Sequence, residues 1–263
     1  MTASSGSAAA SSIVTLNDAS YNFDSITAST ASFALVDNGG VAWSKFSPPA
    51  ANLAGFNKLL IATTIREDVY AALMSYAASS NTAYLQIGQR SASQFRVTGL
   101  GATAKFTGVV GATEKKVLIS LDFSKTELSD QMMCFSDGVR AALDSSSSSN
   151  HLTGDYIFSS NDAFGNSTIP FGLFAAGGGS RITNAAMGFF WMDFYTPSEA
   201  MPDIRDPDVR AAFSAERLGA DGSSDLFGQP LWYYQGTAAE WNAGMANKGS
   251  LIAPLTVGAG GFA

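Results

Sequence analysis

The sequence predicts a mainly β protein, an antiparallel β-sandwich with one short helix and an extended C-terminal segment. Runs rich in Val, Ile, Leu, Phe and Thr recur between residues 13 and 197, and Gly, Asn, Asp and Ser separate them at short intervals. Apolar runs bounded by turn residues are typical of strands, and their close spacing favours antiparallel pairing over an alternating β-α pattern. Charged residues make up only 14% of the chain, below the roughly 25% of an average soluble domain, which suits sheets better than amphipathic helices.

Changes in residue composition along the sequence divide the chain into three parts. Residues 1–12, "MTASSGSAAASS", lack the basic head and long apolar core of a secretion signal and are expected to form a flexible arm. Residues 13–197 form the β region, and residues 198–263 form a C-terminal helix plus an aromatic and glycine-rich extension that packs on the sandwich or on a neighbour. Within the β region we expect strands at 31–36, 57–66, 82–88, 94–99, 104–110, 115–123, 131–136, 168–175 and 185–195.

One predicted hairpin lies in residues 116–143, "KVLISLDFSKTELSDQMMCFSDGVRAAL". Two apolar runs flank a charged gap, which favours two paired strands over one long helix. Asp137-Gly138 then supplies the residues with φ > 0 that a tight turn needs. Cys134 lies inside the second apolar run and is expected to be an inert, buried thiol.

The predicted helix begins at Asp206-Pro207, a capping residue followed by a proline at the first turn. Val209, Phe213 and Leu218 give it one apolar side, and Gly219 is expected to end it.

Composition limits the function classes. The formal charge is −7 and the sequence pI is about 4.6, so the chain lacks the basic stripe that nucleic-acid binding requires. The most apolar segment, residues 184–197, is too short to cross a bilayer and is broken by Asp193, so we expect a buried strand and no membrane insertion. One cysteine and one histidine, His151, cannot form an intrachain disulfide or a histidine-based metal site. We expect no metal and no cofactor.

The order of features in the β region resembles the concanavalin A-like, laminin G-like jelly-roll family. "KLLIATTIR" at 58–66 is similar to an early central strand of that family, and "AYLQIGQRSASQFRVTG" at 83–99 to the hairpin that follows it. The stretch "KKVLISLDFSKTELSDQMMCFSDGVRAAL" resembles the paired strands that end in a turn of the "lyvDGv" kind, and "IPFGLFAAGGGSRITNAAMGFFWMDFYTPSEA" resembles the closing strands. The resemblance implies an antiparallel jelly-roll β-sandwich.

A second resemblance lies in "DPDVRAAFSAERLGADGSSDLFGQPLWYYQGTAAEWNAGMANKGS". It is similar to the tails of laminin G-like proteins encoded among the structural genes of tailed bacteriophages and phage-like particles. Together the two resemblances cover about residues 31–250 and imply a virion component.

Catalytic patterns are missing from the sequence, so we predict no catalytic residue. Glycosidases of this fold family carry a strand of the form Glu-x-Asp-x-x-Glu, whereas Glu127 and Asp130 here lie in a polar turn. His151 follows a serine run, and no Gly-x-Ser-x-Gly elbow accompanies it. Asp221, Gly222 and Asp225 resemble part of a calcium loop without its later acidic ligand, and a turn explains them better.

The densest aromatic group consists of Trp232, Tyr233, Tyr234 and Trp241. These residues are the candidates for glycan stacking or for interface contacts, with the alternative that they hold the C-terminal extension to the sandwich or to a neighbouring subunit.

The expected function is therefore that of a non-enzymatic structural protein of a bacteriophage virion, exposed on tail, neck or capsid. Its partners would be other virion proteins and copies of itself. The alternative is a lectin-like module that binds host-surface polysaccharide.

Overall fold

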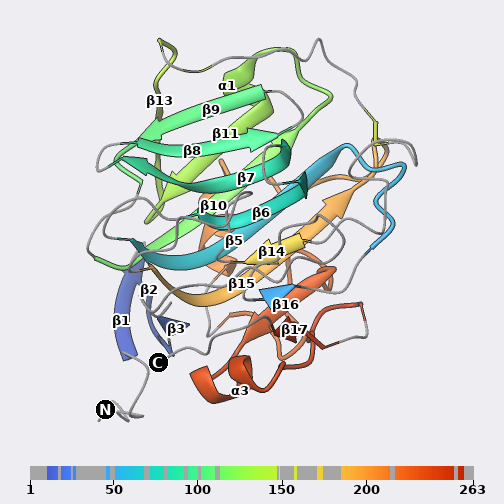
Figure 1. Cartoon of the computed structure of the whole chain (residues 1–263). Coiled ribbons are helices and arrows are strands. Elements are labelled where there is room, and N and C mark those ends of the chain that lie inside the picture. Colours follow the sequence, from blue (N-terminus) through green and yellow to red (C-terminus); the bar gives the residue numbers. More distant parts are fainter. Residues whose placement is uncertain are drawn as a thin grey trace.

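The computed structural model of the chain contains two large antiparallel sheets (Figure 1). The described residues are 11–16, 19–24, 26–27, 46–47, 51–67, 72–79, 82–91, 94–99, 102–109, 113–146, 148, 157–158, 171–173, 185–213, 217–251 and 254–257. Every pairing between these strands is antiparallel, so the predicted mainly β, antiparallel architecture is confirmed.

The first sheet has seven strands, six in one continuous order and a short one, β3, paired with β15. The order is β12 (Val139–Arg140), β11 (Met132–Ser136), β10 (Lys115–Asp122), β5 (Lys58–Glu67), β15 (Ala185–Tyr195) and β16 (Trp232–Gln235), with β3 (Ile26–Thr27) beside β15.

The second sheet has eight strands, and a separate pair lies near the N-terminus. The order is β13 (Ala142–Leu143), β9 (Ala102–Thr107), β8 (Gln94–Gly99), β7 (Thr82–Ser91), β6 (Ala72–Ser79), β14 (Phe171–Leu173), β4 (Phe46–Ser47) and β17 (Thr256–Val257). The pair is β1 (Ser11–Leu16) with β2 (Ala19–Asp24), and the helices are α1 (Leu128–Gln131), α2 (Pro207–Ala212) and α3 (Ala238–Asn242).

Most of the predicted strands coincide with β5, β7, β8, β9, β10, β11 and β15. Of the predicted strand 168–175, the described residues are 171–173, and they form β14. Strand β9 ends at Thr107, before Gly108 turns the backbone to φ 72°. Strands β1, β2, β6 and β16 were not predicted. The predicted strand 31–36 lies outside the described residues, as do residues 1–10 of the predicted arm, while Ser11 and Ser12 open β1.

The predicted hairpin is confirmed. Strand β10 pairs with β11, with Ile119 opposite Cys134, and Asp137 and Gly138 join β11 to β12 with φ angles of 47° and 77°. Two positive φ values in succession are the signature of the type I′ turn that fits the twist of a hairpin. The charged gap contains the short helix α1, which the sequence reading placed in a polar turn.

One hydrophobic cluster fills the space between the two sheets. Strands β8 and β9 alternate buried and half-buried residues, so each sends every second side chain inward. Phe95, Val97 and Phe106 from the eight-stranded sheet meet Ile61 and Ile119 from the seven-stranded sheet in this cluster.

A second cluster lies on the other face of the seven-stranded sheet, under residues 201–213 and 217–227, which we call the C-terminal cover. Leu60, Leu118 and Trp191 of the sheet pack there against Ile204 and Phe213 of the cover. Six consecutive residues of β10 are buried because that strand has a core on each face. This double burial explains why apolar residues occupy both faces of β10, with Val117, Ile119 and Leu121 on one face and Leu118 on the other.

Helix α2 is shorter than predicted. Asp206 caps it by accepting a hydrogen bond from the Asp208 N–H, as expected, but the helix ends at Ala212 and residues 217–219 form a turn and a bend. Val209, Phe213 and Leu218 are nevertheless all buried against the sheet. Packing of the cover therefore uses the predicted apolar residues without continuous helix.

Candidate functional site

The four aromatic residues predicted as contact candidates are core residues of this chain. Trp232, Tyr233, Tyr234 and Trp241 are each 1% exposed or less. Trp232 and Tyr234 point from β16 into the cluster between the sheets, and Tyr233 points to the cluster under the C-terminal cover. Side chains buried to this degree leave no ring face for a sugar or for a neighbouring subunit.

Local structure explains this burial. Strand β16 pairs with β15 and completes the sheet edge, so its alternating side chains enter both cores. Helix α3 begins with a capping box in which Thr237 and Glu240 bind each other's backbone N–H groups. This cap orients Trp241 onto Tyr234, with ring centroids 5.8 Å apart.

The other residues singled out in the sequence also have structural roles. Cys134 is fully buried, and burial raises the pKa of its thiol well above the ordinary value. The Asp221 Oδ1 accepts hydrogen bonds from the N–H and hydroxyl of Ser223, and these bonds lower the pKa of Asp221. That geometry is the turn that was expected. His151 and the Gly177–Gly179 run lie outside the described residues.

A polar cleft of about 400 Å³ opens beside the C-terminal cover. One wall is formed where β5 starts and β10 ends, since Lys58 and Asp122 are direct cross-strand partners. Residues 201–205 at the start of the cover, which we call the cover wall, form another part of the lining, together with Lys125 and Asp130 from the segment around α1. The lining consists of Lys58, Ser120, Asp122, Lys125, Asp130, Met133, Met201, Pro202, Asp203, Ile204 and Arg205.

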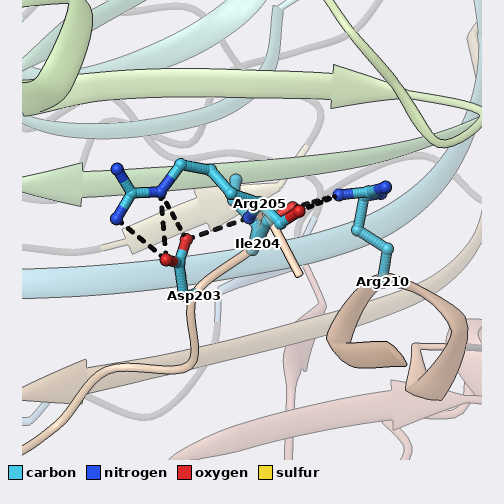
Figure 2. A network of polar contacts seen from close by, with 4 residues as sticks. All are labelled: Asp203, Ile204, Arg205 and Arg210. Atoms are coloured by element: carbon cyan, nitrogen blue, oxygen red, sulfur yellow. Dashed lines mark hydrogen bonds and ion pairs between the residues drawn. The ribbon is translucent and has the colours of Figure 1, made fainter. Parts of the chain in front are cut away.

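The cover wall is held by a network of polar contacts (Figure 2). The Arg205 guanidinium binds the Asp203 carboxylate through Nε, at 2.9 and 3.0 Å, and through Nη2, at 2.8 Å, and this contact lowers the pKa of Asp203. From the other side, Arg210 Nη1 donates to the carbonyl oxygens of Ile204 and Arg205. The three residues 203–205 are thus fixed at both ends.

Arg210 is itself positioned by the sheet. Its guanidinium lies 4.7 Å from the centre of the Phe135 ring, and its carbonyl accepts a 2.6 Å hydrogen bond from the buried Lys116 ammonium. Cation–π contact and a charge-assisted hydrogen bond both stabilise this arrangement. The cover wall therefore connects to β10 and β11 through Arg210.

On the sheet side of the cleft, some polar groups are hydrogen-bonded within the protein and one is not. Lys58 donates to the carbonyl oxygens of Pro197 and Glu199, and Asp122 Oδ1 accepts from the N–H and hydroxyl of Ser124. The Ser120 hydroxyl is different, because the residue is 1% exposed and its oxygen has no hydrogen-bond partner.

Two exposed charged residues, Lys125 and Asp130, also line the cleft. Neither side chain makes a hydrogen bond or salt bridge within the described part of the chain. The cleft thus presents fixed polar walls, a buried hydroxyl and two exposed charged groups.

Sequence reasoning missed this cleft. Lys58 and Asp122 stand at strand ends, where antiparallel pairing brings the start of one strand to the end of its partner. The pairing of these two strand ends could have been predicted from the sequence. The position of residues 201–205 beside them could not, because it depends on how the cover packs on the sheet.

No group of three or more His, Cys, Asp or Glu residues suited to a metal ion occurs in the described ranges. Within the same ranges, none of the helices has the length and apolar character needed to span a membrane.

Comparison with known proteins yields little similarity. No protein-family model and no curated protein matches the chain. Among solved structures, a botulinum neurotoxin type G receptor-binding domain is similar with a TM-score of 0.38 and 14% sequence identity, over 86% of this chain and 55% of that one. The chain thus spans about half the length of that structure, and a similarity of this size establishes neither a shared fold nor a shared function.

Proposed function

We propose that this chain is a non-enzymatic structural protein of a tailed-bacteriophage virion or a related phage-like particle. It is exposed on tail, neck or capsid and acts through assembly contacts with other virion proteins and with copies of itself. The proposal includes a concanavalin A-like, laminin G-like jelly-roll topology for the sandwich. It includes neither nucleic-acid binding nor membrane insertion.

The observation that carries the proposal is the place of the C-terminal segment in the fold. Residues 206–250 carry the resemblance to phage-encoded tails, and the β region carries the resemblance to the jelly-roll family. Strand β16 extends the seven-stranded sheet, and the cover buries its outer face. The stretch that resembles phage-encoded tails and the region that resembles the jelly-roll family are therefore parts of one folded unit, as the proposal requires.

The polar groups of the cleft support a role without catalysis. Asp203 is bound by Arg205, and Asp122 by Ser124, so both carboxylates are committed to structural contacts. Cys134, the single cysteine, has no exposed surface and a raised thiol pKa, whereas nucleophilic cysteines need an accessible thiolate.

Immunogold electron microscopy of purified particles from the producing organism tests the proposal. An antibody against this chain should label a regular head, neck or tail position. A companion experiment removes residues 1–10, which leaves β1 intact, and measures incorporation into particles. Protein that is found free in the medium, with unlabelled particles, would contradict the virion assignment.

The second candidate is a lectin-like module that binds host-surface polysaccharide. The cleft favours it, because a hollow of about 400 Å³ lined by polar side chains falls within the size range of small-ligand sites, roughly 300–1,000 Å³. The buried aromatic group does not contribute to this candidate. On a virion, the two candidates are compatible.

A further inference from the structure

We propose that the cleft beside the C-terminal cover binds an uncharged, polyhydroxylated ligand, a neutral sugar unit, through hydrogen bonds and without aromatic stacking. This inference rests on the lectin-like candidate function and names its site and ligand class. It involves none of the four aromatic residues expected from the sequence.

The charges of the lining select against a charged ligand. Three cationic side chains and three carboxylates line the cleft, so their formal charges cancel. A cleft of one sign would concentrate ions of the opposite sign, and a balanced lining does not. Anionic polymers and divalent cations are therefore poor matches for the site.

Hydrogen-bonding character then selects hydroxyl groups. A carboxylate only accepts hydrogen bonds, whereas lysine and arginine only donate them. A ligand that must satisfy both kinds at close range needs groups that donate and accept, and the hydroxyl group does both. Asp130 and Lys125 illustrate the mixture, since both line the cleft, carry opposite charges and make no side-chain hydrogen bond or salt bridge in the described part of the chain, although Asp130 interacts electrostatically with Arg205.

The Ser120 hydroxyl gives the site a specific polar contact. It lines the cleft, is 1% exposed as a residue, and has no hydrogen-bond partner. Buried polar groups in native proteins almost always have a partner, and an exception calls for an explanation such as a ligand or a water molecule. The oxygen is closed off from solvent, so a ligand hydroxyl would reach and satisfy it after a small movement of the side chains that cover it.

The cleft is also built before a ligand arrives. Arg205 binds Asp203, and Arg210 binds the backbone of residues 204 and 205, so the cover wall is held in place before a ligand binds. Preorganised polar groups lose less entropy on binding. Met201, which is half-buried, supplies a small apolar surface for the C–H face of a sugar ring.

A glycan array followed by calorimetric titration tests the inference. The array presents neutral, uronic-acid and amino-sugar oligosaccharides to the full chain, and the best neutral ligand is then titrated. Ser120→Ala should weaken binding about tenfold, which corresponds to the loss of one hydrogen bond of roughly 1.4 kcal/mol. The same variant should keep its unfolding stability, since it removes a hydroxyl that has no protein partner.

Asp130→Asn and Asp225→Asn form a matched pair of variants. Both residues are exposed, but Asp130 lines the cleft and Asp225 does not. Only Asp130→Asn should weaken binding. The location is overturned if neutral sugars bind with equal affinity to all three variants, and the ligand class is overturned if only charged sugars bind. Absence of any sugar binding, in a chain that still labels particles, overturns this inference and leaves the virion proposal intact.

Discussion

Gly222 is the position where one methyl group should most clearly disturb the C-terminal cover. Its φ is +83°, a left-handed conformation that favours glycine, and its carbonyl accepts a 2.8 Å hydrogen bond from the Trp191 indole N–H. A Cβ added here would lie 2.7 Å from Cγ of the buried Tyr233 ring. Gly222→Ala is therefore expected to destabilise the protein through the backbone and through a steric contact.

The two contributions can be separated in magnitude. A left-handed conformation costs an ordinary L-residue about 1–2 kcal/mol. Overpacking a well-packed core costs about 1–3 kcal/mol more, and Tyr233 cannot move easily because it is 1% exposed. The sum, about 2–5 kcal/mol, is a large share of the roughly 5–15 kcal/mol that stabilises a typical domain.

Gly108→Ala is the matched control. Gly108 has a φ of +72°, and a Cβ there would meet no atom within 4 Å. This variant carries the backbone cost alone, and the effect of alanine on the unfolded chain is the same in both variants. Urea unfolding followed by tryptophan fluorescence should show Gly222→Ala less stable than Gly108→Ala by about 1–3 kcal/mol. Equal losses would refute the claim that Tyr233 is rigidly packed under the cover.

Three further predictions concern buried groups. Burial raises the pKa of Asp193 from 3.8 to about 6. The folded protein therefore favours the neutral carboxyl group, and the stability that this group contributes is fully present below about pH 4 and is lost as pH rises through about 6. We therefore expect the free energy of unfolding of Asp193→Asn, measured with urea, to rise relative to that of the wild type by up to about 3 kcal/mol between pH 4 and pH 8. A difference between the two proteins that does not change with pH would contradict this. Trp241→Ala should lower the free energy of unfolding by about 3–5 kcal/mol, because the ring lies in the core between the sheets, and a fully stable variant would show that the ring is not buried. The Cys134 thiol should not react with a thiol reagent until urea unfolds the chain, and rapid reaction of the native protein would contradict its burial.

Local sequence signals predicted much of the sheet architecture. Alternating and continuous apolar runs located β5, β8, β10, β11 and β15, and Asp137-Gly138 located the turn between β11 and β12. These features depend on residues close in sequence, so their periodicity and turn chemistry are visible without the fold. Strand β6, "ALMSYAAS", was missed because it contains no β-branched residue and many alanines and serines, which give a weak strand signal.

The site depended on contacts that sequence patterns do not encode. The aromatic group 232–234 alternates between two cores, and nothing in its composition distinguishes a buried strand from an exposed stacking surface. The end of helix α2 was placed too late because Val209, Phe213 and Leu218 share one side only if the helix continues, whereas the helix ends at Ala212 and all three side chains still pack in the same cluster. The cleft requires residues 201–205 to approach β5 and β10, a long-range event.

The C-terminal cover contributes both to the stability of the protein and to the proposed sugar site. Residues 201–205 form one wall of the cleft, and Gly222 belongs to the same cover, held to the sheet through Trp191. A ligand that binds only the folded cleft stabilises the protein, by about 2.7 kcal/mol at a hundredfold excess over its dissociation constant. If the cover packs as one unit, Gly222→Ala should weaken sugar binding as well as folding, while Gly108→Ala should not. Should both variants bind sugar normally, residues 201–205 must hold their place through Arg205 and Arg210 alone, and the cleft would be a local structure independent of the rest of the cover.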